Sequence, residues 1–211
     1  MKLYTFYTPN SLKIELALAE LGLDCERENV SLAKGEHMTN DFKKVNPHQK
    51  IPVLEVDGVA IAESGAILQY LGQSNPGPLW PSGPLEAALL SCWMYFEGTH
   101  LASVCSSIWW SDTLSPRRGV PASSDAANAY AEEALVRPLD MLNEVLASRE
   151  FIGGSDFSLA DCALGPTLSL LKDTRLDPSK KWPNIASYTA RIRARDSWMQ
   201  SLGDRRMHWS D

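Results

Sequence analysis

Residues 48–67 read HQKIPVLEVDGVAIAESGAI, and this stretch decides how the rest of the chain is interpreted. Two short apolar runs flank an Asp-Gly dipeptide, which strongly favours a tight turn between antiparallel strands. Pro52 stands just inside the first run, although proline donates no ladder hydrogen bond and is poor in a sheet. Glu63 and Ser64 follow the second run and precede a helical pattern. The stretch therefore predicts a β-hairpin that begins at an unusual proline and leads into a helix.

The chain on both sides of this hairpin alternates strand and helix signals over residues 1–74. Residues 2–7 and 25–32 have the composition of short strands. Residues 11–21 place apolar side chains at helical spacing, and Gly22 suits the left-handed residue that ends a helix. The order of strand, helix, strand, polar connector, hairpin and helix predicts a small α/β domain that matches a thioredoxin-like fold.

A second domain is expected after residues 75–84, NPGPLWPSGP, whose four prolines and two glycines predict a linker. Everything that follows, residues 85–211, has helical spacing. Residues 85–112 predict one long helix that is apolar on nearly all sides and therefore deeply packed. Residues 123–149 predict another helix, kinked at Pro138.

Two further signals belong to this helical half. Ser158-Leu159-Ala160-Asp161 is a variant of the capping box, because Asp161 takes the third position of the helix that Ser158 starts. Pro183 begins the last clear helix, which is predicted to run through Arg195. The fold class predicted for the whole chain is therefore α/β plus all-α.

Composition and charge exclude several classes of protein. The 211 residues are 44% hydrophobic and 22% charged, as in a soluble globular protein, and the net charge of −6 argues against nonspecific binding to nucleic acid or acidic membranes. No apolar run approaches the roughly 18–20 residues of a membrane span, and the N-terminus does not resemble a secretory signal. The four cysteines form neither a C-x-x-C pattern nor a zinc spacing. Free thiols in a reducing cytoplasm, with no metal site, are expected.

Three segments together resemble the cytosolic glutathione transferases. KIPVL at residues 50–54 is followed at the family's spacing by ESGAI at residues 63–67, and SLAD at residues 158–161 resembles the capping box of the family's helical domain. The resemblance covers essentially the whole chain. It implies an N-terminal thioredoxin-like domain joined by a short linker to an all-helical domain. It also implies a homodimer that transfers its co-substrate, glutathione, to an electrophile.

The resemblance further implies how glutathione is held. In the family the peptide bond before the matching proline, here Pro52, is cis, and the N–H and C=O of the preceding Ile51 pair with the ligand's peptide. Ser64, at a helix start, is expected to hold the γ-glutamyl carboxylate, and Glu63 the ammonium group. Simpler roles stay open. The proline can merely block a strand edge, Ser64 can be a plain N-cap, and Glu63 can be a solvated side chain unless it faces inward.

The glycine end of glutathione is a second carboxylate, which requires a cation or a hydrogen-bond donor. His37 and Lys50 match positions that serve this end in related classes, and Gln49 is a further candidate. The alternative for each of the three residues is an exposed polar side chain without a ligand.

The family lowers the pKa of the glutathione thiol with a hydrogen-bond donor at the start of the first helix. This segment is Tyr7-Thr8-Pro9-Asn10-Ser11, and its Thr-Pro-Asn run is similar to bacterial members often called nu-class, in which Thr and Asn contact the sulfur. As contacts of the sulfur, Asn10 and Ser11 rank first, Thr8 next and Tyr7 last. Asn10 stands where other bacterial enzymes carry a cysteine, so redox chemistry by a protein thiol is not expected. Alternatively, Asn10 or Ser11 only caps the helix.

The family's electrophile site lies between the domains, under the first helix and along the long helix after the linker. We expect this site to be lined by Tyr7, Phe96, His100 and Trp109. Further candidates are Tyr95, Trp110, Trp198 and Met199. An aromatic stripe is more often core than pocket, so a purely structural role stays open for each. The second substrate is expected to be a small hydrophobic electrophile or a disulfide.

Two other functions stay open at this stage. One is a glutathione-dependent disulfide or peroxide reductase of the same fold, which the Thr-Pro-Asn run favours. The other is a non-catalytic ligand-binding or regulatory module, which would keep Glu63 and Ser64 and lose thiol activation. The pKa of the bound glutathione thiol would separate an enzyme from a binding module.

Overall fold

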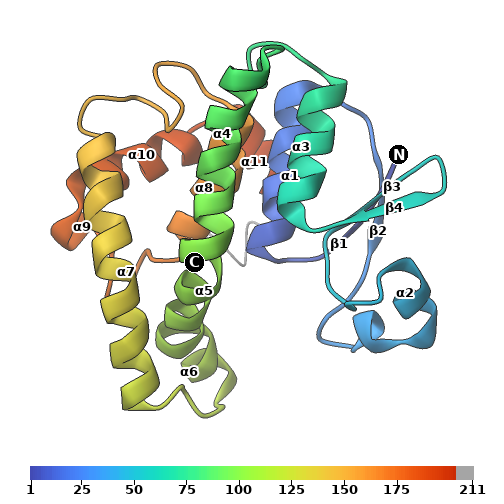
Figure 1. The fold of residues 1–211 in the computed structure, drawn as a ribbon. Helices are drawn as coiled ribbons and strands as arrows, with labels where there is room; N and C mark the ends of the chain where they lie inside the picture. The colour runs from blue at the N-terminus through green and yellow to red at the C-terminus, as the bar shows by residue number, and fades with distance from the viewer. Residues whose placement is uncertain (203–211) are drawn as a thin grey trace.

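The computed structural model describes residues 1–202, and residues 203–211 of the predicted second domain lie outside the described part. Its helices and strands form two successive groups (Figure 1). The first group comprises β1 (Lys2–Thr5), α1 (Pro9–Leu21), β2 (Glu26–Asn29), η1 (Glu36–Met38), α2 (Asn40–Val45), β3 (Val53–Val56), β4 (Val59–Ala62) and α3 (Ser64–Ser74). The second comprises α4 (Pro84–Phe96), η2 (Glu97–Leu101), α5 (Ala102–Trp109), η3 (Trp110–Leu114), α6 (Ser115–Arg118), α7 (Asp125–Val145), α8 (Leu159–Ser169), α9 (Pro178–Lys181), α10 (Pro183–Arg193) and α11 (Asp196–Leu202).

The strands form one sheet in the order β2-β1-β3-β4. β1 is parallel to β2 and antiparallel to β3, and β3 and β4 form the predicted hairpin, with Val53 opposite Ala62. Asp57 and Gly58 have φ values of 51° and 80°, the positive φ that a type I′ turn needs at both central residues. In Figure 1, α1 and α3 lie side by side between the sheet and the second domain. The predicted thioredoxin-like order is therefore confirmed.

Local signals define both ends of α1. Thr8 is the N-cap, its hydroxyl accepts a hydrogen bond from Ser11 N–H, and Pro9 takes the first helical position. Gly22 ends the helix with φ 64°, as its lack of a Cβ allows. The helix thus starts earlier than residue 11, the predicted start, because proline is tolerated in a first turn.

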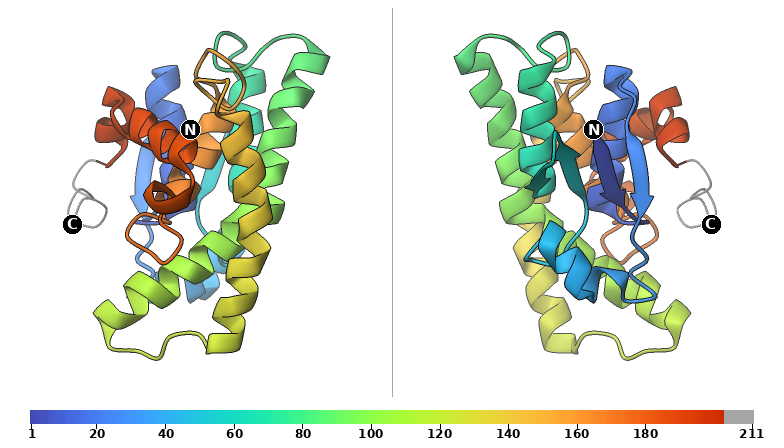
Figure 2. Two further views of the ribbon diagram at one scale, coloured as in Figure 1. Left: turned by 90° about the vertical axis from the view of Figure 1, so that its left-hand side faces the viewer. Right: turned by 90° about the vertical axis from the view of Figure 1, so that its right-hand side faces the viewer.

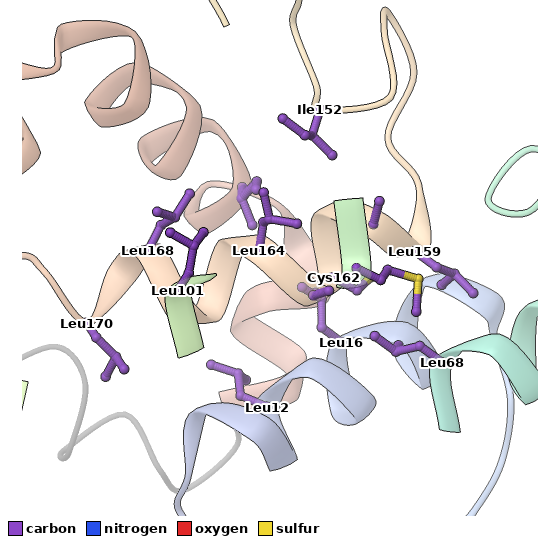
Figure 3. Close-up of a cluster of buried hydrophobic side chains, with 14 of the residues drawn as sticks. Leu12, Leu16, Leu68, Leu101, Ile152, Leu159, Cys162, Leu164, Leu168 and Leu170 are labelled. Atoms are coloured by element: carbon purple, nitrogen blue, oxygen red, sulfur yellow. The ribbon is translucent and has the colours of Figure 1, made fainter. Parts of the chain in front are cut away.

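The core continues from one domain into the other. Leu12 and Leu16 of α1 and Leu68 of α3 belong to the same buried cluster as Leu101 of η2 and Cys162 of α8 (Figure 3). α8 is buried over nearly its whole length, and α1 packs against both α8 and α11. α1 is therefore a layer that both domains share.

The long helix after the linker differs from the prediction. It runs through α4, η2, α5, η3 and α6 in succession, and η2 and η3 are π-helical segments of five residues each. The prediction of deep packing on all sides is wrong for α4, because Leu85, Leu89 and Tyr95 are 68%, 58% and 65% exposed. Composition cannot separate a face that meets the core from an apolar face left open at the surface.

The remaining helices complete the second domain. α7 continues through Pro138 and runs back beside the long helix, and a loop joins the two at one end of the molecule (Figures 1 and 2). α10 begins at Pro183 as predicted. It is not the last helix, however, since α11 follows at Asp196 and packs against α1. Within residues 1–202, no helix is both long enough and apolar enough to cross a membrane.

Candidate functional site

A cavity of about 430 Å³ opens where α1 begins, beside the segment that ends in η1 and the loop that enters β3. Its lining brings together several residues that the sequence singled out. The lining residues are Thr8, Asn10, Leu32, His37, Met38, His48, Gln49, Lys50 and Ile51. Candidates for the thiol end and for the glycine end of one ligand therefore share a single cavity.

The loop that leads into α1 presents Thr8 and Asn10 and withdraws Ser11. Ser11 is fully buried, and its hydroxyl oxygen accepts a hydrogen bond from the Thr8 hydroxyl at 3.0 Å. Ser11 Oγ also accepts a hydrogen bond from Phe6 N–H at 3.4 Å. Asn10 is exposed at the cavity mouth. Of the three residues predicted to contact the sulfur, Thr8 and Asn10 line the cavity, while Ser11 supports Thr8 from behind.

The loop before β3 is held by Asn46, a residue that the sequence pattern does not single out. Asn46 Nδ2 donates to Lys50 O at 2.7 Å, and Asn46 Oδ1 accepts from His48 N–H at 3.0 Å. The only local sign of this role is the Asn-Pro dipeptide itself, a frequent start of turns. The peptide bond between Ile51 and Pro52 is cis, as the family resemblance implies.

His37 of η1 and Gln49 and Lys50 of the loop before β3 line the same cavity. Gln49 adopts φ 54° and donates its side-chain N–H to His37 O at 3.3 Å. His37 Nδ1 is buried and, within residues 1–202, has no hydrogen-bond partner. A buried polar atom without a partner costs free energy, so an incoming hydrogen-bonding group is one explanation for it. Lys50 is exposed beside it.

Glu63 and Ser64 stand next to Pro52 because Val53 pairs with Ala62 in the hairpin. Glu63 is exposed and has φ 70° and ψ 119°, a backbone conformation that is unusual for a residue with a side chain. Among the described residues, no side chain caps the N-terminus of α3. The first N–H groups of this helix are therefore available to an anion.

The residues predicted to line the electrophile site do not share one cavity. Phe96 and His100 line a cavity of about 650 Å³ against α7. Tyr7 lines a cavity of about 700 Å³ formed with α1, β2 and α11. Trp109 is half-buried against the core. The further candidates also differ in exposure, since Tyr95, Trp110 and Met199 are exposed and Trp198 is buried.

The predicted capping box is confirmed at the start of α8. Asp161 accepts hydrogen bonds from the Ser158 N–H (2.9 Å), the Ser158 hydroxyl (2.8 Å), the Ile152 N–H (2.8 Å) and the Tyr188 hydroxyl (2.9 Å). Burial raises the pKa of Asp161, and the four donors oppose that rise by stabilising the carboxylate. The partnership with Tyr188 leaves no sequence signal, because the two residues are far apart in the chain.

The described residues contain no group of His, Cys, Asp and Glu side chains that could hold a metal ion. All four cysteines are free thiols. Burial raises the pKa of Cys105 and Cys162, so these two thiols stay protonated. Within the described part of the chain, the lining of the cavity at α1 contains no cysteine. Its polar groups for ligand binding are hydroxyl, amide, imidazole and ammonium groups.

Comparisons with known proteins agree with this geometry. The family model "Glutathione S-transferase, N-terminal domain" matches residues 1–73, and "Glutathione S-transferase, C-terminal domain" matches residues 102–196. A glutathione S-transferase of Hyoscyamus muticus is 28% identical over 199 residues, which cover 92% of this chain and 93% of the relative.

Solved structures give the same result. A glutathione S-transferase domain-containing protein of Marinobacter aquaeolei is 31% identical, with a TM-score of 0.80 and coverage of 94% of this chain and 100% of that one. A glutathione transferase of Burkholderia graminis, described with two glutathione molecules bound per subunit, is 26% identical, with a TM-score of 0.83. That match covers 95% of this chain and 86% of the other.

Proposed function

The chain belongs to the glutathione S-transferase family and is a glutathione transferase with glutathione as its co-substrate; from this premise we propose which residues bind and activate glutathione. The observation that carries the proposal is the cavity where Thr8, Asn10, His37 and Lys50 converge, next to the uncapped start of α3. Glutathione is an extended tripeptide with a carboxylate at each end and a thiol between them. The cavity and the helix start offer a partner for each of these groups.

The γ-glutamyl end lies at the start of α3. Its carboxylate accepts hydrogen bonds from the Ser64 hydroxyl and from the first N–H groups of α3, where the helix dipole also favours negative charge. Its ammonium group pairs with the exposed carboxylate of Glu63, which precedes Ser64 directly. In the middle of the ligand, the main chain of Ile51 pairs with the cysteinyl residue as an added strand would.

The glycine carboxylate lies at the other end of the cavity. His37 donates to it through the imidazole, whose Nδ1 is buried without a partner among residues 1–202, and Lys50 contributes a positive charge. Gln49 plays a supporting part, because its side-chain N–H already bonds His37 O. The site thus takes an anion at each end, in keeping with the chemistry of glutathione.

Thr8 and Asn10 contact the sulfur. In the structure the Thr8 hydroxyl donates to Ser11 Oγ, so we propose that it turns to the sulfur when glutathione binds. Together with the Asn10 amide it then donates hydrogen bonds that stabilise a thiolate without taking its proton. Lowering the pKa of a thiol by about two requires about 2.7 kcal/mol of differential stabilisation. Ser11 acts through Thr8, whose hydroxyl it holds at 3.0 Å. This use of the Thr-Pro-Asn run is the one that bacterial, nu-class-like members make of it.

The second substrate is a small hydrophobic electrophile. The thiolate of glutathione forms a bond to an electrophilic carbon, and the leaving group departs with the bonding electrons. Catalysis consists of thiol ionisation and alignment of the two substrates. Phe96 and His100, which share one cavity, are the proposed aromatic contacts of the electrophile, whereas Tyr7 lines a different cavity.

We also propose that the protein is a homodimer. Leu85, Leu89 and Cys92 are exposed on one face of α4, and Val59 of β4 is 65% exposed. Exposed apolar side chains grouped on one helix face favour contact with another protein surface. Sizing at micromolar concentration should give twice the 23.3 kDa chain mass. A clean monomer would contradict the dimer.

The free thiols fit a reducing compartment, and we place the protein in the cytoplasm.

The experiment that tests thiol activation measures the pKa of bound glutathione from its thiolate absorbance. In the wild type we expect this pKa to lie well below the ordinary thiol value of about 8.5. Thr8→Ala and Asn10→Ala should each raise it, while Ser74→Ala, at the far end of α3, should leave it unchanged. An unshifted pKa in the wild type would overturn the assignment and favour a binding module without catalysis.

A further inference from the structure

A buried ion pair joins the two domains through the middle of α1. Lys13 Nζ of α1 donates to Glu97 Oε1 of η2 at 2.8 Å, and the same oxygen accepts a hydrogen bond from Thr167 Oγ1 of α8 at 2.5 Å. Lys13, Glu97 and Thr167, here termed the buried network, are only 1%, 4% and 1% exposed. Three elements from both domains are therefore tied together out of contact with water.

Burying two charges is a costly way to hold these helices together. Both ions lose their hydration, and an apolar set of similar volume is often at least as stabilising. Burial lowers the pKa of Lys13, and the charge and hydrogen bond of Glu97 oppose that shift. What the polar groups add over apolar packing is direction, because ammonium, carboxylate and hydroxyl bond well in few arrangements. The buried network therefore fixes the relative position of the helices more narrowly than leucines would.

The buried network joins the two helices that carry the two sides of the proposed reaction. Lys13 follows Thr8 on α1, and Glu97 opens η2 directly after Phe96. His100 of η2 lies close to Phe96, with the two rings 5.3 Å apart. π-helical segments inside α-helices occur frequently at functional sites. The anchored carboxylate thus sits where the long helix changes its winding, beside residues expected to meet the second substrate.

We propose that Lys13, Glu97 and Thr167 are positioning residues, which align the thiol-binding start of α1 with the second-substrate side of the long helix. This inference rests on the proposed function, because it takes the sulfur to lie at Thr8 and the electrophile to lie beside Phe96 and His100 of the long helix. Reactions between two bound groups depend steeply on alignment, and a displacement of about 1 Å can cost about a hundredfold in rate. Glutathione contacts the first domain, so its affinity does not depend on the buried network.

The test uses Glu97→Gln and a charge-free triple variant, Lys13→Met/Glu97→Leu/Thr167→Val. The triple variant leaves no charge buried without a partner, so it should melt within about 4 °C of the wild type. Both variants should bind glutathione within about twofold of the wild type by calorimetry. Both should lower kcat for conjugation of chlorodinitrobenzene at least about tenfold. If the triple variant does not fold, Glu97→Gln, which keeps the shape of the side chain, still gives the comparison.

Lys181→Met is the matched control, because it removes the same charge from an exposed pair with Asp140, whose members are 55% and 49% exposed. It should keep the wild-type kcat. A triple variant that also keeps the wild-type kcat overturns the proposal, and so does a loss of glutathione affinity as large as the loss of kcat.

Hydrogen–deuterium exchange gives a second readout that needs no activity. At equal global stability, amides in the first turns of α1 and in η2 should exchange faster in the triple variant than in the wild type. Unchanged exchange overturns the proposal. A wild type that binds no glutathione would instead overturn the proposed function, and the exchange rates would still decide whether the buried network orders these helices.

Discussion

The starts of α3 and α8 each combine a serine with an acidic residue, Glu63 directly before Ser64 at α3 and Asp161 three positions after Ser158 at α8, and the two starts differ in almost every other respect. At α8, Asp161 gathers four hydrogen bonds, two of them from Ser158, and is 0% exposed. At α3, Glu63 is exposed with φ 70°, and among the described residues no side chain caps the helix that begins at Ser64. A serine and a carboxylate thus make a closed structural cap in one domain and an open helix end in the other. Hydrogen-bond satisfaction, rather than residue type, separates the structural site from the candidate binding site.

The largest effect should come from breaking the closed end. Asp161→Ala removes the acceptor of four buried or partly buried donors, so it should lower the free energy of unfolding by at least about 3 kcal/mol. Urea denaturation followed by tryptophan fluorescence measures this loss. Asp156→Ala, at an exposed position a few residues earlier, is the control and should stay within about 0.5 kcal/mol of the wild type. Similar losses in both variants would mean that the α8 start is not specially closed.

A second prediction uses the other end of α3, which is closed by packing. A Cβ added at Gly72 would lie 2.4 Å from Cδ2 of Trp80, a linker residue that is buried against α3. Gly72→Ala should therefore cost about 1–3 kcal/mol of unfolding free energy, although alanine by itself favours a helix. Gly65→Ala, in the first turn of the same helix, has no atom within 4 Å of the added Cβ and should not be destabilised. A destabilised Gly65→Ala would show that the start of α3 is as crowded as its end.

A smaller effect should appear at the open site in binding rather than in folding. His37→Ala should weaken glutathione about tenfold, or about 1.4 kcal/mol, because the glycine carboxylate loses a donor. The control is calorimetry with γ-glutamylcysteine, which lacks the glycine. The wild type and His37→Ala should bind this dipeptide with the same affinity. Equal weakening of both ligands would place His37 elsewhere in the site or give it a purely structural role.

The features that could be predicted from the sequence are those set by local chemistry. The Asp57-Gly58 turn, the alternation of strands and helices, and the capping box at Ser158 each depend on residues a few positions apart, and all three are confirmed. Part of the candidate site can also be predicted, because KIPVL and ESGAI are each short unbroken motifs in the sequence. The roles assigned to His37 and Ser64 stay predictions until a ligand is bound.

The features that could not be predicted depend on contacts between distant residues. Lys13 meets Glu97 across 84 positions, and neither residue carries a local sign of its partner. In the sequence of α1, Lys13 has the pattern of an ordinary surface lysine. It is buried because the second domain packs over it, which the local sequence does not indicate. The face with Leu85 and Leu89 is predicted to be core and is exposed instead, for a related reason. An apolar helix face has the same composition whether its cover is this chain or another surface.

The central claim is that the start of α3 is left open for a carboxylate, and one calorimetric series tests it most directly. Glutathione is titrated into the wild type, Ser64→Ala and Thr39→Ala, the last of which removes an ordinary N-cap from α2. We expect saturable binding by the wild type, about tenfold weaker binding by Ser64→Ala at unchanged stability, and wild-type affinity for Thr39→Ala. If Ser64→Ala bound glutathione as the wild type does but unfolded more easily, Ser64 would serve only the stability of the first turn of α3, and this assignment would be wrong.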